Sequence, residues 1–491
     1  MKNDFPAPKK IGLLPQLGLY TSTAIVIGAV IGSGIFKKPA FMAHALGSPE
    51  LMLLVWVVAG LITLFGALTN AEVAGLIPKT GGQFIYFREM YGDMTGYIYG
   101  WAMLSVVQCG SIASITYVFS EYLQYFFTLP RFSPEIEQQI YLFLPGIGKI
   151  FPLMDIGVKS VTILLILSLS FVNYLGVKFG GSISAFFTTA KVAAMGLLIG
   201  ACFIFSDGSA SNLTTNIPNF HLGSAGMLGA IIAALSAAFW AYDGWNNITY
   251  LSGEIKNPKK NVPLALTIGI VVVIAVYLLI NVAFLYVLPA EQMAGSKLVA
   301  ADVAKRAIGV SGGALVAILV MVSTFGTANG TIMASARVYY AMARKNLFFH
   351  SAGNAHPKYR TPSRALAIQA IWASMLVLSG SFDNLTDMLI FVSWIFYALG
   401  AYGVFILRKK MPNHERPYKV WGYPYVPIIF IIFATGFVII TLYNDITNYY
   451  NGNSQIINSL FGLFLVSTGI PLYVWFKKKN KNKEIKNDDV D

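Results

Sequence analysis

The stretch IGAVIGSGIFKKP, residues 27–39, interrupts an apolar segment with Gly32-Ser33-Gly34 and then resumes as Ile35-Phe36. A glycine inside a helix costs roughly 1 kcal/mol relative to alanine. In a lipid bilayer, a broken helix also leaves backbone N–H and C=O groups without hydrogen-bond partners. A break at membrane depth therefore indicates that something at this position compensates for those groups.

The composition places almost the whole chain in a membrane. Of the 491 residues, 56% are hydrophobic and 12% are charged, and the mean hydropathy is +0.63. A soluble domain carries about 25% charged residues. Apolar runs long enough to cross a bilayer predict an all-α protein with twelve membrane spans and no soluble domain. The predicted spans are 14–45, 50–77, 94–128, 157–175, 182–205, 226–253, 262–288, 311–342, 365–380, 385–408, 424–444 and 457–476.

These spans predict a single integral membrane domain over residues 1–476, with spans 1–10 (14–408) as its core and spans 11 and 12 (424–476) as an addition. The N-terminal MKNDFPAPKK is not expected to be a signal peptide, because it has no small-residue cleavage site and the apolar stretch after it is too long. The tail 477–491, KKKNKNKEIKNDDVD, is expected to be a solvated charge run without fixed structure.

The positive charges set the orientation, since cytoplasmic loops carry the excess of Lys and Arg. With both termini in the cytoplasm, most of the 35 basic residues fall in the tails and in inner loops, and three outer loops contain none. The net charge of +13 is therefore assigned to membrane orientation, not to nucleic-acid binding. The inner loops are 78–93, 176–181, 254–261, 343–364 and 409–423, and the outer loops without Lys or Arg are 206–225, 381–384 and 445–456.

The sequence offers no support for an enzyme. HExxH, paired CxxC, GxSxG and Walker sequences are missing from it, so no metal, cofactor or catalytic residue is expected. Both cysteines, Cys109 and Cys202, fall inside predicted spans, so no disulfide framework is implied.

A second interruption lies in span 6, in FWAYDGWNNITYLSGE (239–254), where Asp243 and Gly244 fall at the centre of an apolar run. Paired breaks in spans 1 and 6 are the arrangement of two inverted five-helix repeats with discontinuous helices at the bilayer midplane. The helix N-terminus after Ser33 offers N–H groups to a carboxylate, and the unwound carbonyls of span 6 would accept an ammonium group. Together the two breaks favour a zwitterion as ligand. The alternative is that the glycines only allow close helix packing.

Several long motifs resemble the amino acid–polyamine–organocation superfamily, and within it the L-type amino acid transporter family. The resemblance extends over spans 1 to 10 and implies the LeuT fold, a 5+5 inverted repeat that works by alternating access. The motifs are GAVIGSGIF (28–36), AEVAGLIPKTGGQFIYFRE (71–89), AYDGWNNITYLSGEIKNPKKNVP (241–263), STFGTANGTIMASARVYYAMARKN (323–346) and TPSRAL (361–366).

The resemblance also implies the binding residues. The family's carboxylate site falls on Gly32, Ser33 and Gly34, and Val30 would line the side-chain pocket. The family's amino-group site falls on the backbone carbonyls of span 6, and the aromatic residue that covers the substrate matches Trp240. These carbonyls belong to Trp240, Ala241 and Asp243.

Lys191 lies near the middle of span 5, which is too deep for its ammonium group to reach water comfortably. The resemblance places it where sodium-coupled relatives hold a cation between spans 1 and 8. We expect the ammonium to replace that cation, with Gly28 C=O and the hydroxyl of Ser323 or Thr324 as acceptors. The alternatives are a lysine that only bridges helices, and a lysine that loses its proton during transport.

Other charged residues have competing interpretations. Asp243 either attracts a cationic substrate side chain, as in relatives that exchange cationic and neutral amino acids, or caps the inner half of span 6. Glu72 is expected to lock the inner gate region, and Arg337 to extend from the inner end of span 8 toward water. Lys37 and Lys38 are expected to face the outer vestibule, without a reason for two lysines.

We therefore expect a sodium-independent amino acid carrier of the cell membrane that exchanges neutral L-amino acids. Acceptance of cationic amino acids is a secondary hypothesis. The alternatives are a proton-coupled symporter, a polyamine or cationic amino acid permease, and, more remotely, an amino acid sensor. The eukaryotic members use a cysteine in the loop between spans 3 and 4 to join a glycoprotein. The loop 129–157 has no cysteine, so no such partner is expected.

Overall fold

The computed structural model describes residues 17–79, 81–175, 180–222, 226–359 and 361–488. The predicted N-terminal cytoplasmic segment and most of the inner loop 176–181 lie outside the described residues, as do the last three residues of the tail.

Long helices follow the predicted spans, which confirms the all-α membrane architecture. Among the described residues, 11 segments are long and apolar enough to cross a membrane, and the ninth predicted span is a shorter apolar helix of 17 residues. The spans, in chain order, are α1 (Leu19–Val30) with α2 (Gly34–Leu46), α3 (Pro49–Leu76), α5 (Asp93–Ala102) with η1 (Met103–Val107) and α6 (Gln108–Leu123), α8 (Ile156–Tyr174), α9 (Gly180–Phe205), α10 (Gly226–Tyr242) with α11 (Asn247–Tyr250), α12 (Pro258–Val287), α15 (Val310–Arg344), α16 (Ser363–Ser379), α17 (Phe382–Lys410), α18 (Tyr425–Tyr450), and α19 (Asn458–Ser467) with α20 (Gly469–Asp488).

The connecting segments contain short elements that the sequence analysis did not predict. The largest group lies in the outer loop 129–157, where β1 and β2 form an antiparallel hairpin. The short elements are α4 (Gln83–Tyr91), α7 (Pro134–Gln139), β1 (Leu142–Leu144), β2 (Gly148–Ile150), η2 (Ala210–Leu213), η3 (Ser252–Glu254), α13 (Ala290–Ala294), α14 (Val299–Ile308) and η4 (His350–Gly353).

The C-terminal helix is longer than expected. α20 continues to Asp488, so the expectation of a tail without fixed structure is wrong up to that residue. Lys and Glu are good helix formers, and a helix that already exists extends without a new nucleation step.

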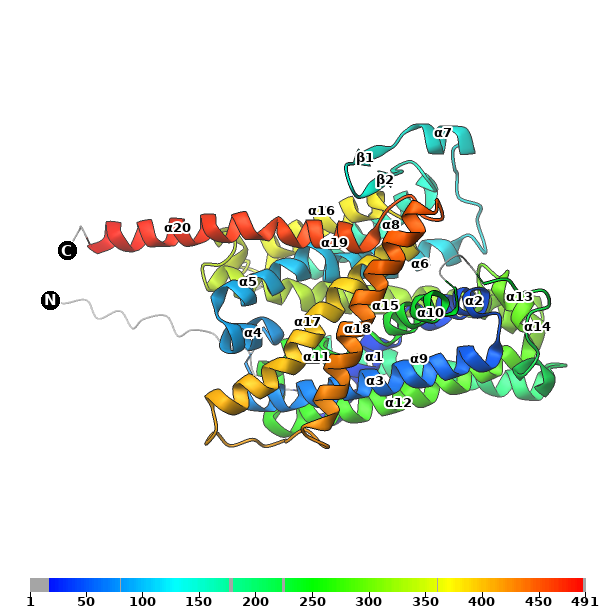
Figure 1. Cartoon of the computed structure of the whole chain (residues 1–491), viewed down its shortest axis with the longest axis horizontal. Coiled ribbons are helices and arrows are strands. Elements are labelled where there is room, and N and C mark those ends of the chain that lie inside the picture. Colours follow the sequence, from blue (N-terminus) through cyan, green and yellow to red (C-terminus); the bar gives the residue numbers. More distant parts are fainter. Residues whose placement is uncertain (1–16, 80, 176–179, 223–225, 360, 489–491) are drawn as a thin grey trace.

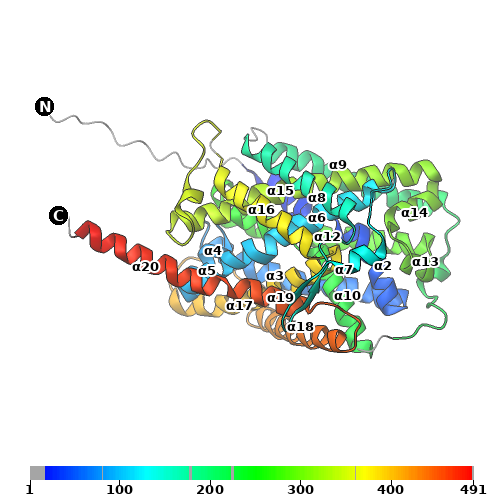
Figure 2. The ribbon, with the colours of Figure 1, turned by 90° about the horizontal axis from the view of Figure 1, so that it is seen from above.

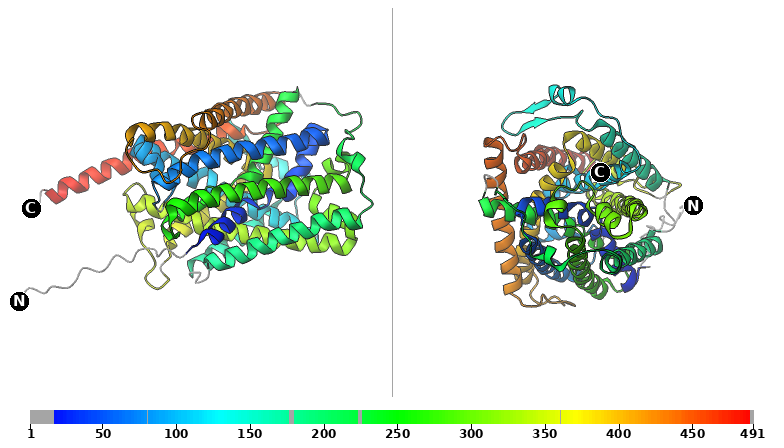
Figure 3. Two further views of the ribbon diagram at one scale, coloured as in Figure 1. Left: turned by 90° about the horizontal axis from the view of Figure 1, so that it is seen from below. Right: turned by 90° about the vertical axis from the view of Figure 1, so that its right-hand side faces the viewer.

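Several long spans run side by side along the long axis of the molecule, as α3 and α12 show in Figure 1, whereas α18 crosses them obliquely. Figure 2 shows α20 extending past one end of the bundle, and the end-on view in Figure 3 shows most helices in cross-section. The interrupted pairs lie inside this bundle, because α1 packs against α9 and α12, and α10 packs against α2, α3 and α17.

Burial separates the helices of the interior from those at the periphery. In α6 and in the outer half of span 1 most residues are buried, whereas α9 exposes Leu197 (76%) and Ile204 (72%). Large apolar side chains exposed along a span are expected to face lipid, which is as apolar as they are. The interior therefore holds the two helix breaks, and α9 carries Lys191 inward from the periphery.

Candidate binding site

The first break separates α1, which ends at Val30, from α2, which begins at Gly34. Ser33 is the N-cap of α2, yet its hydroxyl makes no capping hydrogen bond. Its Oγ is buried and has no hydrogen-bond partner among the described residues. The first amide groups of a helix lack an acceptor within that helix, so this end of α2 offers donors to an anion.

The second break separates α10, which ends at Tyr242, from α11, which begins at Asn247. Gly244 has a φ of +98°, a conformation that glycine adopts without steric cost. The Asp243 carboxylate accepts a hydrogen bond of 2.6 Å from the hydroxyl of Tyr397 on α17. The N-cap of α11 is Asn246, so the predicted capping role of Asp243 is wrong for this helix. The Asp243 carboxylate instead links the second break to α17, which is span 10, through the hydrogen bond from Tyr397.

The two breaks pack against each other, and a glycine of each break contacts the backbone of the other helix pair. A Cβ added at Gly34 would lie 2.5 Å from the Cα of Ala241, and one added at Gly244 would lie 2.8 Å from the carbonyl oxygen of Ala29. Such contacts are too short for any side chain, so both glycines are required by the crossing. The geometry matches the paired discontinuous helices expected of an inverted repeat.

A tyrosine that the sequence analysis missed joins the two breaks. The Tyr277 hydroxyl on α12 lies 3.0 Å from the carbonyl oxygen of Val30 and 2.9 Å from that of Ala241. Both oxygens are acceptors, so the single hydroxyl proton is shared between them. Nothing in the aliphatic run around Tyr277 marks it as functional, except that it is a polar group in mid-span.

The carbonyls predicted to accept an ammonium group already have partners in two cases. The Trp240 carbonyl accepts from the Asp243 N–H at 3.2 Å, and the Ala241 carbonyl accepts from Tyr277. A carbonyl oxygen has two lone pairs, so each can accept a second hydrogen bond. The Trp240 Nε1 is buried without a hydrogen-bond partner among the described residues.

Two adjacent lysines close the outer end of this site. The Lys37 ammonium pairs with Glu121 on α6, and the Lys38 ammonium pairs with Asp383 on α17 at 2.8 Å. Both ammonium groups lie 4.7 Å from the centre of the Phe382 ring. That ring in turn contacts the Trp240 ring edge-on, with centroids 6.1 Å apart. The two lysines therefore fasten α2 to two different helices over Trp240.

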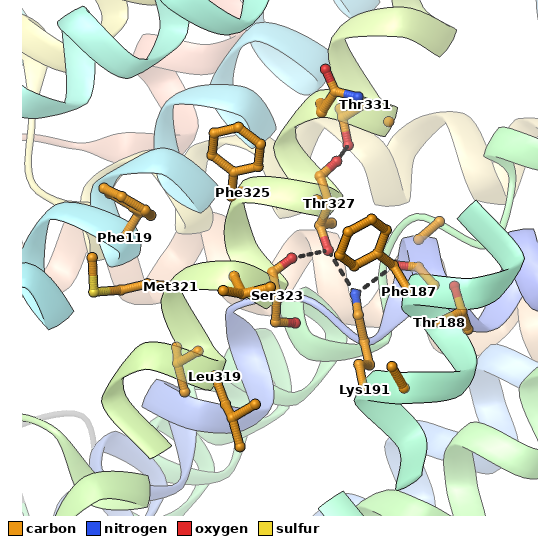
Figure 4. Close-up of a pocket in the computed structure, with 18 of the residues that line it drawn as sticks. Phe119, Phe187, Thr188, Lys191, Leu319, Met321, Ser323, Phe325, Thr327 and Thr331 are labelled. Carbon is orange, nitrogen blue, oxygen red and sulfur yellow. Dashed lines mark hydrogen bonds between the residues drawn. The ribbon is translucent and has the colours of Figure 1, made fainter. Parts of the chain in front are cut away.

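Lys191 reaches the end of α1 from α9. Its Nζ lies 2.7 Å from the Ile31 carbonyl oxygen, 3.3 Å from the Gly28 carbonyl oxygen and 3.0 Å from the Thr327 hydroxyl. Figure 4 shows Lys191 and Thr327 pointing toward each other from α9 and α15. The Thr327 hydroxyl donates its own proton to the Ser323 carbonyl at 2.9 Å. An ammonium group has three donors, and it faces three acceptors here.

The predicted contact of Lys191 with Gly28 is present, but the predicted hydroxyl partner is wrong. The Ser323 Oγ has no hydrogen-bond partner among the described residues, and the Thr324 hydroxyl donates to the Val320 carbonyl at 2.8 Å. The true partner, Thr327, lies one helical turn after Ser323, on the same face of α15. The quoted motif contains Thr327, so this spacing was the signal that could have identified it.

A cavity of about 1260 Å³ lies beside the first break, between α1, α9 and α15. Gly28, Lys191 and Thr327 line it, and Figure 4 shows the aromatic side chains of Phe119, Phe187 and Phe325 around it. The lining does not include the predicted substrate residues. Those residues are Val30, Gly32, Ser33, Gly34, Trp240, Ala241 and Asp243.

Ion pairs hold the inner ends of the spans. Glu72 accepts two hydrogen bonds, of 2.9 and 2.7 Å, from Arg408 at the end of α17. Glu254 and Arg337, which both line the cavity, lie 3.3 Å apart. Glu72 thus links α3 to α17, and its expected role at an inner gate stays a prediction, whereas Arg337 has an acidic partner in place of the expected contact with water alone. Over residues 17–79, 81–175, 180–222, 226–359 and 361–488, no cluster of His, Cys, Asp and Glu is placed to hold a metal ion.

Comparisons with known proteins agree with this geometry. The Amino acid permease family model matches residues 17–466. The Serine/threonine exchanger SteT of Bacillus subtilis is 32% identical over 480 residues, which cover 95% of this chain and 98% of that protein. The human b(0,+)-type amino acid transporter 1 is 32% identical over 84% of this chain and 80% of that protein. The human cystine/glutamate transporter is 28% identical over 96% and 88%. The resemblance in the sequence motifs is thereby confirmed, and the chain belongs to the amino acid permease family.

Proposed function

We propose that this chain is an amino acid exchanger of the cell membrane that works by alternating access and does not require sodium. The observation that carries the proposal is the set of three acceptors around the Lys191 ammonium. Two of them are carbonyl oxygens at the C-terminal end of α1, where the helix dipole favours a positive charge. A cation that belongs to the protein itself already stabilises these oxygens.

The substrate site is proposed at the crossing of the two breaks. The substrate carboxylate is bound by the amide groups of Gly32, Ser33 and Gly34 together with the unpaired Ser33 hydroxyl. The substrate ammonium group is bound by the carbonyl oxygens of Trp240, Ala241 and Asp243 at the second break, where Ala241 packs directly against Gly34. Val30 lines the side-chain pocket, and the Trp240 ring covers the bound substrate.

Neutral L-amino acids are the proposed main substrates. The Asp243 carboxylate is engaged by Tyr397, so a neutral side chain leaves no charge in the pocket without a partner. A second candidate is the acceptance of cationic amino acids, because the same carboxylate would attract an Arg or Lys side chain. The name of one relative, the serine/threonine exchanger of Bacillus subtilis, specifies amino acids with neutral side chains.

A second candidate function is proton-coupled transport, and it rests on the same lysine. All three neighbours of the Lys191 Nζ act as acceptors, so loss of its proton would break one of three hydrogen bonds and loosen the end of α1. No catalytic role is proposed. We also propose that the chain works without a disulfide-linked glycoprotein, since the loop 129–157 has no cysteine.

Exchange in proteoliposomes tests this function. Uptake of labelled serine, leucine and arginine is compared between vesicles that contain an unlabelled amino acid and empty vesicles, with sodium or choline outside and over a series of pH values. An exchanger shows uptake only into preloaded vesicles and the same rate in both salts. Uptake that requires sodium contradicts the proposal. Uptake into empty vesicles that follows an imposed pH gradient favours the proton-coupled candidate instead.

A further inference from the structure

The loop between spans 3 and 4 contains an exposed apolar surface that includes none of the residues of the proposed substrate site. Four consecutive residues, Ile140, Tyr141, Leu142 and Phe143, are each about half exposed or more, at 53%, 47%, 56% and 54%. Successive side chains of a strand point to opposite faces, so both faces of β1 are exposed here. We refer to these four residues as the hairpin surface.

Charge is almost missing from the loop around this surface. Between Gln138 and Met154 the sequence has one charged residue, Lys149, and its ammonium lies 4.5 Å from the centre of the Tyr141 ring. The nearest acidic side chain, Glu137, is buried and pairs with Arg131 at 2.7 Å. The hairpin itself therefore has no carboxylate and presents apolar groups outward, and Glu137 of α7, which lies just before it in the sequence, is buried.

The hairpin is fastened to the segment that directly precedes span 12. The Lys149 N–H donates to the Gln455 carbonyl at 2.8 Å, and the Ile457 N–H donates to the Ile147 carbonyl at 2.8 Å. α19 begins at Asn458, directly after this contact. Because one residue of extended chain spans about 3.3 Å, β2 cannot lie far from the level at which span 12 enters the membrane.

The hairpin lies beside the bundle and not beyond its end. Figure 1 shows β1, β2 and α7 along the side of the molecule, whereas α13 and α14 lie at the outer end. The end-on view in Figure 3 shows the same hairpin outside the outline of the helices. A segment in this place faces the lipid that surrounds the spans.

We propose that the hairpin surface lies in the outer interface of the bilayer and anchors this loop among the lipid headgroups and upper acyl chains. Tyr and Trp are enriched in this layer, and Tyr141 is one of the four residues. The free edge of β1 fixes the depth, because β1 pairs only with β2 among the described residues. Its outer N–H and C=O groups need water or headgroups as partners, which the hydrocarbon core does not supply. This inference does not depend on the substrate or on the coupling.

A fluorescent probe at Phe143 tests the proposal in the full chain. Cys109 and Cys202 are buried, so a thiol-reactive NBD probe is directed to the new cysteine of a Phe143→Cys variant reconstituted in phosphatidylcholine vesicles. The matched control is Lys297→Cys, an exposed position in the outer loop between α13 and α14. Leu142→Cys, on the other face of β1, provides a second position if Phe143→Cys does not fold.

The expected result is quenching of the hairpin probe by lipids that carry a nitroxide high on the acyl chain, several-fold stronger than quenching by aqueous iodide. The control probe should show the reverse order. Quenching of the hairpin probe by iodide alone would place the surface in water and overturn the proposal. Protection from both quenchers, with energy transfer between labelled copies, would instead identify a second copy of the chain as the occupant and overturn it equally.

Discussion

Lys191 on α9 donates a hydrogen bond of 2.7 Å to the carbonyl oxygen of Ile31, the first residue beyond α1. Ile31 is also the C-cap of that helix, and its N–H bonds to the Ile27 carbonyl. The lysine thus occupies the point at which α1 stops being a helix. Any movement of α1 that opens the inner side of the site must either break this hydrogen bond or move Lys191 together with α1.

Lys191→Met removes the charge and retains most of the length of the side chain. Two carbonyl oxygens and a hydroxyl then lose a charged donor, at about 1–3 kcal/mol for each buried group left unpaired. We expect the exchange rate to fall by at least roughly tenfold, which corresponds to 1.4 kcal/mol, and the remaining activity to stay indifferent to sodium. The measurement is exchange in proteoliposomes at equal protein content. A normal rate in this variant would reduce Lys191 to a lysine that bridges helices.

Thr327→Val removes the hydroxyl between Lys191 and Ser323 at nearly constant volume. We expect a loss of exchange in the same direction as for Lys191→Met, but smaller, because the two carbonyl contacts remain. Thr324→Val is the matched control, since the Thr324 hydroxyl bonds only within its own helix. If the two variants exchange at the same rate, the Thr327 contact has no part in coupling.

The sequence predicts the breaks well because their chemistry is local. Gly32-Ser33-Gly34 and Asp243-Gly244 are poor helix formers inside otherwise apolar spans, so the positions of both interruptions follow from the chain alone. The span lengths follow from bilayer thickness for the same reason. Even the contact of Lys191 with the end of α1 follows from the depth of the charge together with the family resemblance.

The hydrogen-bond and ion-pair partners of these groups cannot be predicted in the same way, because they depend on how the helices are placed against each other and on contacts distant in sequence. Lys38 and Asp383 lie 345 residues apart in the chain, and no periodicity links them. Thr327 rather than Ser323 contacts Lys191 because the ammonium meets α15 one helical turn further along the same face than expected. Tyr277 appears in the sequence as a single tyrosine in the aliphatic run of span 7. Its role is visible only where two carbonyl oxygens meet its hydroxyl.

Gly34→Ala places a methyl group 2.5 Å from the Cα of Ala241, and the backbone must move to accommodate it. We expect substrate affinity to fall strongly, because the two breaks would separate at the proposed carboxylate site. The readout is thermal stabilisation of the purified protein by added amino acid. Gly436→Ala on α18 is the control, since a Cβ at that position meets nothing within 4 Å and alanine favours a helix. Substrate stabilisation of the normal size in Gly34→Ala would contradict the site assignment.

Tyr277→Phe deletes the hydroxyl that joins the Val30 and Ala241 carbonyls and leaves the ring in place. One net hydrogen bond is worth about 0.5–1.5 kcal/mol, so stability should change little. Transport should change more, because the two breaks then move independently. Tyr339→Phe is the comparison, since it removes a buried hydroxyl that bonds to the Met103 carbonyl, away from both breaks. Equal effects of the two variants on stability and on exchange would show that Tyr277 serves packing alone.

Lys38→Met tests whether the outer pair of lysines holds the site closed from outside. Lys38 is 1% exposed and contacts both Asp383 and Thr386, whereas Asp383 is 45% exposed and can be hydrated once it is released. Loss of the Lys38–Asp383 ion pair therefore favours the outward-open state, in which α2 and α17 separate. A Trp240→Cys reporter in the Lys38→Met background should react faster with a membrane-impermeant maleimide added outside than the same reporter in the parent chain.

Lys79→Met controls for the general effect of losing a lysine from an ion pair. Lys79 is 66% exposed and lies 3.6 Å from Glu89, and exposed ion pairs contribute about 0–1 kcal/mol. The Lys79→Met substitution should leave the labelling rate of the Trp240→Cys reporter unchanged. Lys37→Met should act in the same direction as Lys38→Met, since Lys37 fastens α2 to α6. If labelling of the reporter is equally slow in all three backgrounds, the lysines do not hold the outer side closed.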